Sequence, residues 1–244
     1  MVKHRCGSLM VMEEGVMAGI VTERDILDKL GAADVGVSRS TTVSKIMTPA
    51  SAMITAGPNF TLDRCVKQMQ GGVFRHLPIV SDGAVKACIS MRDVAQQIAS
   101  GLGKKPLDNP PTVSDLMDVK GQGGCLTLGE TGSVSDAVGL MQQSKAGSLL
   151  ITNPGSASRY GIFTERDYLT KVAVYGEQSP SEIRIAHVAT PSVLVTSVSP
   201  ESRVTDCLSV MLAGGFRHVP VVAKGEPVGM VSMRDILNFF LGAS

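Results

Sequence analysis

Apolar residues between positions 62 and 69 recur with the spacing of one helix face, at Leu62, Val66 and Met69. Two short apolar runs follow at 77–80 and 85–89, and the Ser-Asp-Gly segment between them is typical of a turn that joins two strands. A further helix is expected to begin within residues 90–93, and an earlier strand is expected around 52–55. The pattern therefore predicts a β-α-β-β-α unit.

The segment that opens the last helix of this unit recurs four times, at residues 19–25, 87–93, 161–167 and 229–235. The first and third copies end in Thr-Glu-Arg-Asp, and the second and fourth end in Ser-Met-Arg-Asp. We call them the A copies and the B copies. An offset of 142 residues also relates 74–78 to 216–220, Thr48 to Thr190 and Cys65 to Cys207. Such self-similarity predicts four copies of one unit in the order A-B-A-B.

Domain boundaries follow from this repeat. We predict a first module at 1–100, with a partial copy one at 1–41 and copy two at 42–100. The second module is predicted at 113–242, with copy three at 113–176 and copy four at 185–242. The stretch 101–112 contains glycine and proline breakers and is predicted to be a linker. The expected fold class is α/β (α+β), with two pseudo-twofold modules.

Copy one differs from the others in length. When residues 7–9 are aligned with 147–149, nothing in copy one matches the stretch from about 113 to 140, which holds the first strand and helix of copy three. A half-copy would leave apolar faces of its neighbours uncovered. We therefore expect the natural chain to extend upstream of Met1.

Composition narrows the classes of function. The chain is 43% hydrophobic with a mean hydropathy of +0.18, and its apolar runs are strand-sized, which predicts a globular protein without a membrane span. Basic and acidic residues nearly cancel at 23 and 22, so no nucleic-acid partner is predicted. The five cysteines form no C-x-x-C pair and the four histidines show no ligand spacing, so no metal site is expected. A reducing, intracellular location is favoured.

Each repeated motif admits two interpretations. The hydroxyl residue and the aspartate three positions later match a capping box, which is frequent at helix starts. Capping does not explain the arginine between them, because the positive end of the helix dipole disfavours a basic residue at a helix start. A bound nucleotide would explain the arginine. The hydroxyl, the helix amides and the arginine can face a phosphate, while the aspartate accepts hydrogen bonds from the ribose hydroxyls. The candidate residues are Thr22, Arg24, Asp25, Ser90, Arg92, Asp93, Thr164, Arg166, Asp167, Ser232, Arg234 and Asp235.

A second basic feature is confined to the B copies. Arg75-His76 and Arg217-His218 begin a strand there, whereas the A copies carry small residues at 6–8 and 146–148. A lone histidine in such a place is usually packed or solvated, but its recurrence beside arginine favours a phosphate contact. No nucleophile, base and acid come together in the sequence, so no catalytic residue is predicted.

These motifs resemble the CBS domain, named after cystathionine β-synthase, whose tandem pair is called a Bateman module. The resemblance rests on the G-h-x-[ST]-x-x-D signature, on the [RH]-h-P-V strand before it and on the I-M-T-P sequence at 46–49, and it covers essentially the whole chain. It implies paired sheets with two clefts per module for AMP, ADP or ATP, or for S-adenosylmethionine or NAD. Two departures from the family pattern are Ala87 in place of glycine and Met117-Asp118 where I-M-T-P would stand.

By resemblance, the ribose role falls on the four aspartates of the motif and the hydroxyl role on Thr22, Ser90, Thr164 and Ser232, with Thr48 and Thr190 as further cleft contacts. The second half also resembles plant mitochondrial proteins built from one CBS pair, which suggests an organelle such as the mitochondrion. The family further implies that two modules close into a disk within one chain, which we expect here, or pair between chains as a homodimer.

We predict a non-catalytic regulatory protein that senses adenine nucleotides and passes the signal to a partner protein of unknown identity. No cofactor is required, and Mg²⁺ enters only with ATP. The alternatives are a protein-interaction scaffold whose motifs only cap helices and, least favoured, an enzyme whose catalytic domain lies elsewhere. Because copy one is partial and copy two carries Ala87, we expect Arg217→Ala to weaken binding more than Arg75→Ala.

Overall fold

The structure is a computed structural model that describes residues 1–4, 6–31, 33, 35–72, 74–102, 109–120, 125–153 and 160–241. The chain forms two compact units. Compact unit 1 comprises Met1–Met53 and Cys125–Val195, and compact unit 2 comprises Ile54–Gly124 and Thr196–Ser244. Most of copies one and three therefore lies in compact unit 1, and most of copies two and four lies in compact unit 2. Residues 42–53 and 185–195, at the starts of copies two and four, belong to compact unit 1, and residues 113–124, at the start of copy three, belong to compact unit 2. The module boundaries drawn from the sequence stay a prediction, and residues 103–108 of the proposed linker lie outside the described residues.

Copy one begins with an antiparallel hairpin of β1 (Ser8–Glu13) and β2 (Val16–Thr22), which leads into α1 (Glu23–Leu30). The two-residue turn at 14–15 has positive φ at both positions, as a tight hairpin turn requires. The following segment forms α2 (Val35–Ser40), α3 (Val43–Ile46), β3 (Thr48–Pro49) and the 3-10 turn η1 (Ala50–Ala52). Because β3 pairs with β2, the beginning of copy two completes the sheet of copy one.

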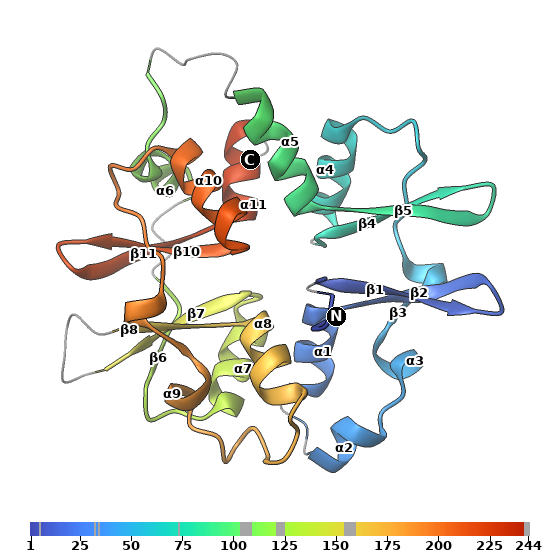
Figure 1. Cartoon of the computed structure of the whole chain (residues 1–244), viewed down its shortest axis with the longest axis horizontal. Coiled ribbons are helices and arrows are strands. Elements are labelled where there is room, and N and C mark those ends of the chain that lie inside the picture. Colours follow the sequence, from blue (N-terminus) through green and yellow to red (C-terminus); the bar gives the residue numbers. More distant parts are fainter. Residues whose placement is uncertain are drawn as a thin grey trace. The chain divides into compact units, whose positions relative to one another are not determined.

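Copy three has the fuller version of the same arrangement (Figure 1). Its sheet has the order β6-β7-β8-β9 and consists of β6 (Thr127–Gly129), β7 (Ser148–Thr152), β8 (Tyr160–Thr164) and β9 (Thr190–Pro191). The helical segments are α7 (Val134–Gln143), α8 (Glu165–Asp167), the π-helical η2 (Tyr168–Ala173), α9 (Ile185–Val188) and the 3-10 turn η3 (Ser192–Leu194). Again the start of the next copy completes the arrangement, because α9, β9 and η3 belong to copy four.

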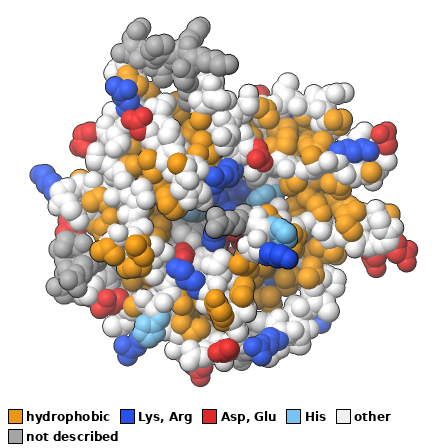
Figure 2. Space-filling view, viewed as in Figure 1, with side chains coloured by type: hydrophobic (Ala, Val, Ile, Leu, Met, Phe, Trp, Pro, Cys, Tyr) orange, Lys and Arg blue, Asp and Glu red, His pale blue; other side chains and the backbone are white. Residues whose placement is uncertain are grey.

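Copies one and three share one core in compact unit 1. Leu27 of α1 belongs to the same buried cluster as Val138 of α7 and Phe163 of β8. The face of β1 is more open than that of its counterpart β7, since Leu9 is 43% exposed and Leu149 is 1% exposed. Figure 2 shows hydrophobic side chains at the surface over the β1–β2 hairpin. The difference follows from β6 and α7, which contact β7 in copy three.

Compact unit 2 contains two hairpins and five helices among its described residues. The strands are β4 (His76–Ser81) with β5 (Ala84–Ser90), and β10 (His218–Ala223) with β11 (Glu226–Ser232). The helices are α4 (Leu62–Gly71), α5 (Met91–Leu102), α6 (Val113–Lys120), α10 (Val204–Gly214) and α11 (Met233–Leu241). The helix α5 packs against α10 and α11, so copies two and four share one core.

The predicted helix, hairpin and second helix of copy two are confirmed as α4, β4–β5 and α5. Val66 and Met69 are buried as expected, but Leu62 is 40% exposed because it is the first residue of α4. The strand predicted around 52–55 is wrong. A 3-10 turn ends at Ala52, and the parallel pairing shrinks to one bridge between Ala56 and Ile79. Gly57 and Pro58 follow directly, and neither favours a longer strand, since proline has no N–H to donate.

The glycine of the repeated signature has a steric role where a third strand covers the hairpin. A Cβ at Gly161 would lie 2.9 Å from the carbonyl oxygen of Thr190 in β9, and Gly19 meets β3 in the same way. In copy two Ala87 is exposed, and β5 pairs with β4 alone among the described residues. Position 87 therefore does not require the glycine of the family signature, because no third strand covers β5 among the described residues. In copy four, a Cβ added at Gly229 would meet the side chain of Met117 in α6, so the Met117-Asp118 sequence that departs from the family pattern lies against β11.

Cys65 and Cys207 are buried in the core of compact unit 2, as expected for small hydrophobic residues. Burial raises the pKa of the Cys65 thiol and raises that of Cys207 to about 11. Both thiols are therefore protonated near neutral pH, which does not favour redox chemistry.

Candidate functional site

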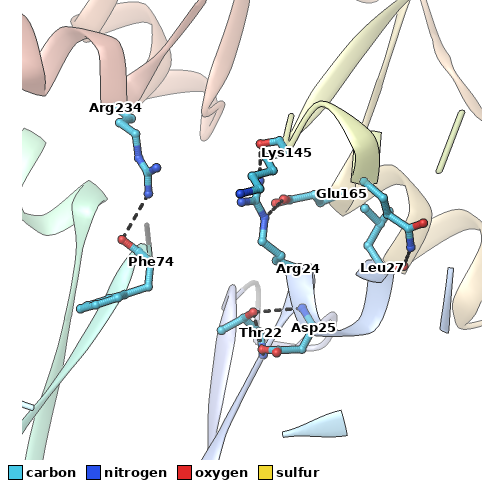
Figure 3. A network of polar contacts seen from close by, with 9 residues as sticks. Thr22, Arg24, Asp25, Leu27, Phe74, Lys145, Glu165 and Arg234 are labelled. Atoms are coloured by element: carbon cyan, nitrogen blue, oxygen red, sulfur yellow. Dashed lines mark hydrogen bonds and ion pairs between the residues drawn. The ribbon is translucent and has the colours of Figure 1, made fainter. Parts of the chain in front are cut away.

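All four repeated motifs form a reciprocal cap at the start of a helix. In copy one the Thr22 hydroxyl donates to Asp25 Oδ2 at 2.7 Å and accepts from the Asp25 amide at 3.2 Å, while the Thr22 amide also donates to Oδ2 (Figure 3). The same reciprocal bonding joins Ser90 to Asp93, Thr164 to Asp167 and Ser232 to Asp235. The capping interpretation therefore holds in every copy.

Capping alone does not distinguish these motifs from other helix starts. Ser133 and Asp136 form the same box at α7, and Thr112 and Asp115 form it at α6. Hydrogen bonds from Ser133 and Thr112 lower the pKa of Asp136 and Asp115, respectively. Neither box contains an arginine. The arginine and the surroundings of the aspartate are thus what separates the repeated motif from an ordinary cap.

In the A copies the arginines bind glutamates of the facing copy. Arg24 Nε lies 2.9 Å from Glu165 Oε1, and its guanidinium also donates to the carbonyl of Lys145 (Figure 3). Reciprocally, Arg166 Nε lies 3.1 Å from Glu23 Oε1. Both glutamates are almost fully buried. The positive charge that seemed to call for a nucleotide therefore has a carboxylate partner within compact unit 1.

The B copies have no such glutamates in their motifs. Met91 and Met233 stand in their place and are 3% exposed in the core. Arg92 donates to the carbonyl of Leu212 at 2.6 Å, and Arg234 donates to the carbonyl of Phe74 at 3.4 Å (Figure 3). A carbonyl oxygen carries no full charge, so these contacts do not neutralise the two guanidinium groups.

The aspartates also differ between the two kinds of copy. In the A copies the remaining oxygen, Oδ1, pairs with a lysine four residues later, Lys29 with Asp25 and Lys171 with Asp167. At the same offset the B copies carry Gln97 and Phe239, which have no charge. Thr190 Oγ1 lies 3.4 Å from Asp167 Oδ1, so this predicted cleft residue is brought beside its aspartate. Thr48, its counterpart in β3, pairs with Ile20 of β2.

The structure brings the Arg-His pairs of the B copies beside their motifs. His76 lies opposite Ser90 across the β4–β5 hairpin, and the Arg75 carbonyl accepts from the Met91 amide that begins α5. The same register places His218 opposite Ser232, and the Arg217 carbonyl accepts a hydrogen bond from the Met233 amide. In the A copies serines occupy the histidine positions. Basic side chains, the hydroxyl and the aspartate therefore gather at one end of each B hairpin.

Sequence reasoning missed the glutamates at 23 and 165 and the lysines at 29 and 171. The sequence contains a signal for each pair. Glutamate in the A copies alternates with methionine in the B copies at the second motif position, and a lysine four residues after the motif aspartate recurs only in the A copies. Within the described part of the chain, no group of three histidine, cysteine or acidic residues could hold a metal ion. No helix among those residues is long and apolar enough to cross a membrane.

Comparison with known proteins identifies relatives along most of the chain. The CBS domain family model matches residues 1–32, 43–100 and 185–242. The chain is 31% identical over 174 residues to the CBS domain-containing protein CBSX3, mitochondrial, of Arabidopsis thaliana, an alignment that covers 70% of this chain and 83% of that protein. It is 26% identical over 262 residues to the CBS domain-containing protein CBSCBSPB3 of Arabidopsis thaliana, which covers 94% of this chain and 46% of that protein.

Solved structures show the same fold. Protein MJ1225 of Methanocaldococcus jannaschii, described as a proposed archaeal homologue of γ-AMPK, aligns with a TM-score of 0.80 at 17% identity. The alignment covers 98% of this chain and 90% of that one. The fold of the chain therefore has a counterpart in an experimental structure.

Proposed function

Because the chain belongs to the CBS domain family, we propose that it is a non-catalytic regulatory protein that binds an adenine nucleotide and passes the signal to a partner protein. The observation that carries the proposal is the gathering of Arg-His, hydroxyl and aspartate at one end of each B hairpin. Cationic donors suit a phosphate, and a carboxylate suits the hydroxyls of ribose. The description of MJ1225 as a γ-AMPK homologue supports the same class of ligand.

In the proposed site the aspartates of the motif bind ribose, the hydroxyls and arginines face phosphate, and Thr48 and Thr190 add contacts. Arg75-His76 and Arg217-His218 provide further phosphate contacts. No cofactor is needed, and Mg²⁺ accompanies ATP only. The relation to CBSX3 supports an organellar location such as the mitochondrion. The regulated partner and possible homodimer formation belong to the same proposal.

Isothermal titration with AMP, ADP and ATP tests the function, with S-adenosylmethionine and NAD as further ligands. We expect at least one adenine nucleotide to bind with a dissociation constant below 1 mM. Absence of heat with all three nucleotides at millimolar concentration would exclude the proposal. The scaffold alternative predicts that Asp167→Ala lowers stability by the roughly 0.5–2 kcal/mol of a lost cap and alters no ligand affinity.

A pair of variants tests the phosphate contact. We expect Arg217→Ala to lower affinity about tenfold or more, since a charge-assisted hydrogen bond contributes roughly 1.5–3 kcal/mol. Arg75→Ala is expected to have the smaller effect because copy one is partial and copy two carries Ala87. Unchanged affinity of Arg217→Ala would remove this residue from the site, and a larger loss from Arg75→Ala would reverse the order.

A further inference from the structure

One face of copy one, formed by β1 and α1, is less covered than the corresponding face of the other copies. Leu9 of β1 is 43% exposed, and Ile26 of α1 is only partly buried. The residues at the position of Leu9 in the other copies are no more than 1% exposed, and they are Leu77, Leu149 and Val219. Those at the position of Ile26 are no more than 2% exposed, and they are Val94, Tyr168 and Ile236. Copy one therefore exposes apolar side chains at two positions that belong to the core elsewhere.

In each of the other copies this face is covered by a strand–helix segment, a short stretch that pairs in parallel with the first hairpin strand and leads into a helix. The parallel pairs are Leu128 with Ile151, Ala56 with Ile79, and Val198 with Val221. The helices that follow are α7, α4 and α10, and each contacts its hairpin. In α7 and α10 the buried residues lie at i, i+3, i+4 and i+7, and α4 buries the last three of these positions. The covering element is thus an amphipathic helix with a strand before it.

The β1–β2 hairpin has the backbone geometry that such a segment pairs with. Its register matches that of β4–β5 and β10–β11, including the irregularity between Val11 and Met12. In copy two the Pro78 carbonyl accepts from the Ala56 amide, and the Val80 amide donates to the Ala56 carbonyl. Met10 and Met12 occupy the places of Pro78 and Val80 in copy one. No segment of the described chain pairs with this edge of β1, and an unpaired edge is a template for an added strand.

The matching place in copy three is open as well. At the end of α1, Gly31 is buried, and a Cβ added there would lie 2.7 Å from Val138 Cγ1 of α7. At the corresponding end of η2, Ala173 and Val174 are exposed. The reciprocal ion pairs between the two copies indicate that they face each other symmetrically. A helix placed on copy one as α7 lies on copy three would therefore reach the end of η2.

We propose that this face of copy one, defined by Leu9, Val11 and Ile26, binds a strand–helix segment of a partner protein. The three such segments among the described residues already cover their own copies, so the occupant is assigned to another chain. It would add a short strand parallel to β1 and lay an amphipathic helix, apolar at i, i+3, i+4 and i+7, on the three side chains. The inference rests on the proposed function in naming how the partner is held, and it requires no nucleotide.

A peptide of residues 125–145, which carries β6 and α7, is the probe, because it covers the corresponding face in copy three. Fluorescence anisotropy with the full chain should give a dissociation constant below about 100 µM, modest because the free peptide must become ordered. Val138→Asp with Met141→Asp in the peptide should weaken binding about tenfold or more, since a charge would enter an apolar contact. Absence of binding up to about 1 mM would overturn the inference.

The strand and the helix can be tested separately. In copy three the Glu130 amide donates to the Thr152 carbonyl at 2.9 Å, and Met12 occupies the place of Thr152 in copy one. A peptide that is N-methylated at Glu130 loses this donor and should bind about threefold to tenfold more weakly. Unchanged affinity of the N-methylated peptide would overturn the addition of a strand to β1.

A substitution in the chain locates the surface. Leu9→Glu should weaken peptide binding about tenfold or more, and its exposure allows the chain to fold. Val193→Glu is the matched control, because Val193 is 88% exposed in the same compact unit, and its binding should stay within about twofold of the unaltered chain. Equal effects of the two substitutions would overturn the location. Circular dichroism melting of both variants distinguishes a lost surface from a lost fold.

Further measurements separate this inference from the nucleotide function. Light scattering that shows a dimer dissociated by Leu9→Glu would assign the face to a second copy and overturn its assignment to a partner. Titration with AMP should give the same affinity for Leu9→Glu as for the unaltered chain. Peptide binding by a chain that binds no adenine nucleotide would exclude the nucleotide function and retain the surface, whereas nucleotide binding without peptide binding would overturn the surface alone.

Discussion

Compact units 1 and 2 use the same hairpin and helix but place charge in opposite ways. In compact unit 1 each motif arginine pairs with a buried glutamate of the facing copy, and each aspartate pairs with a lysine. In compact unit 2 methionines replace the glutamates, the arginines donate to carbonyls, and histidines flank the motif. The same repeated cap is therefore combined with ion pairs between two copies in compact unit 1 and with hydrogen bonds to carbonyl groups in compact unit 2.

The buried glutamates also explain a specificity of pairing. A buried carboxylate without a counterion is costly, so Glu23 and Glu165 favour a neighbour that brings an arginine. The methionines of the B copies would not satisfy Arg24 or Arg166. We interpret the alternation of glutamate and methionine as a reason why copy one shares its core with copy three.

Removing the arginine partner of a buried glutamate should have the largest effect on stability. Arg24→Ala leaves Glu165 buried without this counterion and is expected to cost about 3–5 kcal/mol. Arg92→Ala, its counterpart in compact unit 2, loses a hydrogen bond to a carbonyl and should cost about 1–2 kcal/mol. Urea unfolding measures both. Equal losses would contradict the difference between the two compact units.

The signature glycine of copy one should matter more than the alanine of copy two, because a third strand covers Gly19 and none covers Ala87 among the described residues. Gly19→Ala puts a Cβ 2.5 Å from the carbonyl oxygen of Thr48, and the strain should cost about 1–3 kcal/mol. Ala87→Gly changes an exposed position in an uncovered strand and should cost no more than about 1 kcal/mol. Thermal melts compare the two variants, and tolerance of Gly19→Ala would refute the steric role.

Alkaline pH should affect compact unit 2 before compact unit 1. Burial raises the pKa of Cys207 from 9.0 to about 11 and that of Tyr168 from 10.0 to about 12. In each interval only the unfolded state ionises, so stability is complete below the ordinary pKa and is lost as pH rises toward the raised one. Each loss should be on the order of 2–3 kcal/mol, since one pKa unit corresponds to about 1.4 kcal/mol. Urea unfolding between about pH 8 and pH 12, with Cys207→Ala and Tyr168→Phe, should show each variant losing its own part of the pH dependence.

The smallest effect should come from the ion pairs between residues four apart. Lys171→Ala removes three hydrogen bonds and should cost about 1 kcal/mol. Lys67→Ala breaks an exposed pair and should cost no more than about 0.5 kcal/mol. Salt titration of the melting temperature sharpens the test, because the exposed pair is screened more strongly. The reverse order would show that Lys171 does not hold its aspartate.

The amino-acid sequence by itself determined the repeat, the helices and the hairpins. Leu77 to Ile89 alternate around an Asp-Gly turn with φ values of 53° and 73°, and the apolar spacing of α4 marks its buried face. The caps at Thr22, Ser90, Thr164 and Ser232 also follow from local sequence. These features depend on residues within a few positions of one another, and such contacts are encoded in local periodicity.

Only the tertiary structure decided which copies share a core and which charges meet. Arg24 and Glu165 are 141 positions apart, and no local period states that their helices face each other. A 3-10 turn ends at Ala52 where a strand was expected near 52–55. The alanine at position 87 is explained by the absence of a third strand beside β5 among the described residues. The physical reason is that period and propensity specify the faces of an element, whereas burial and charge pairing between distant segments specify what covers each face.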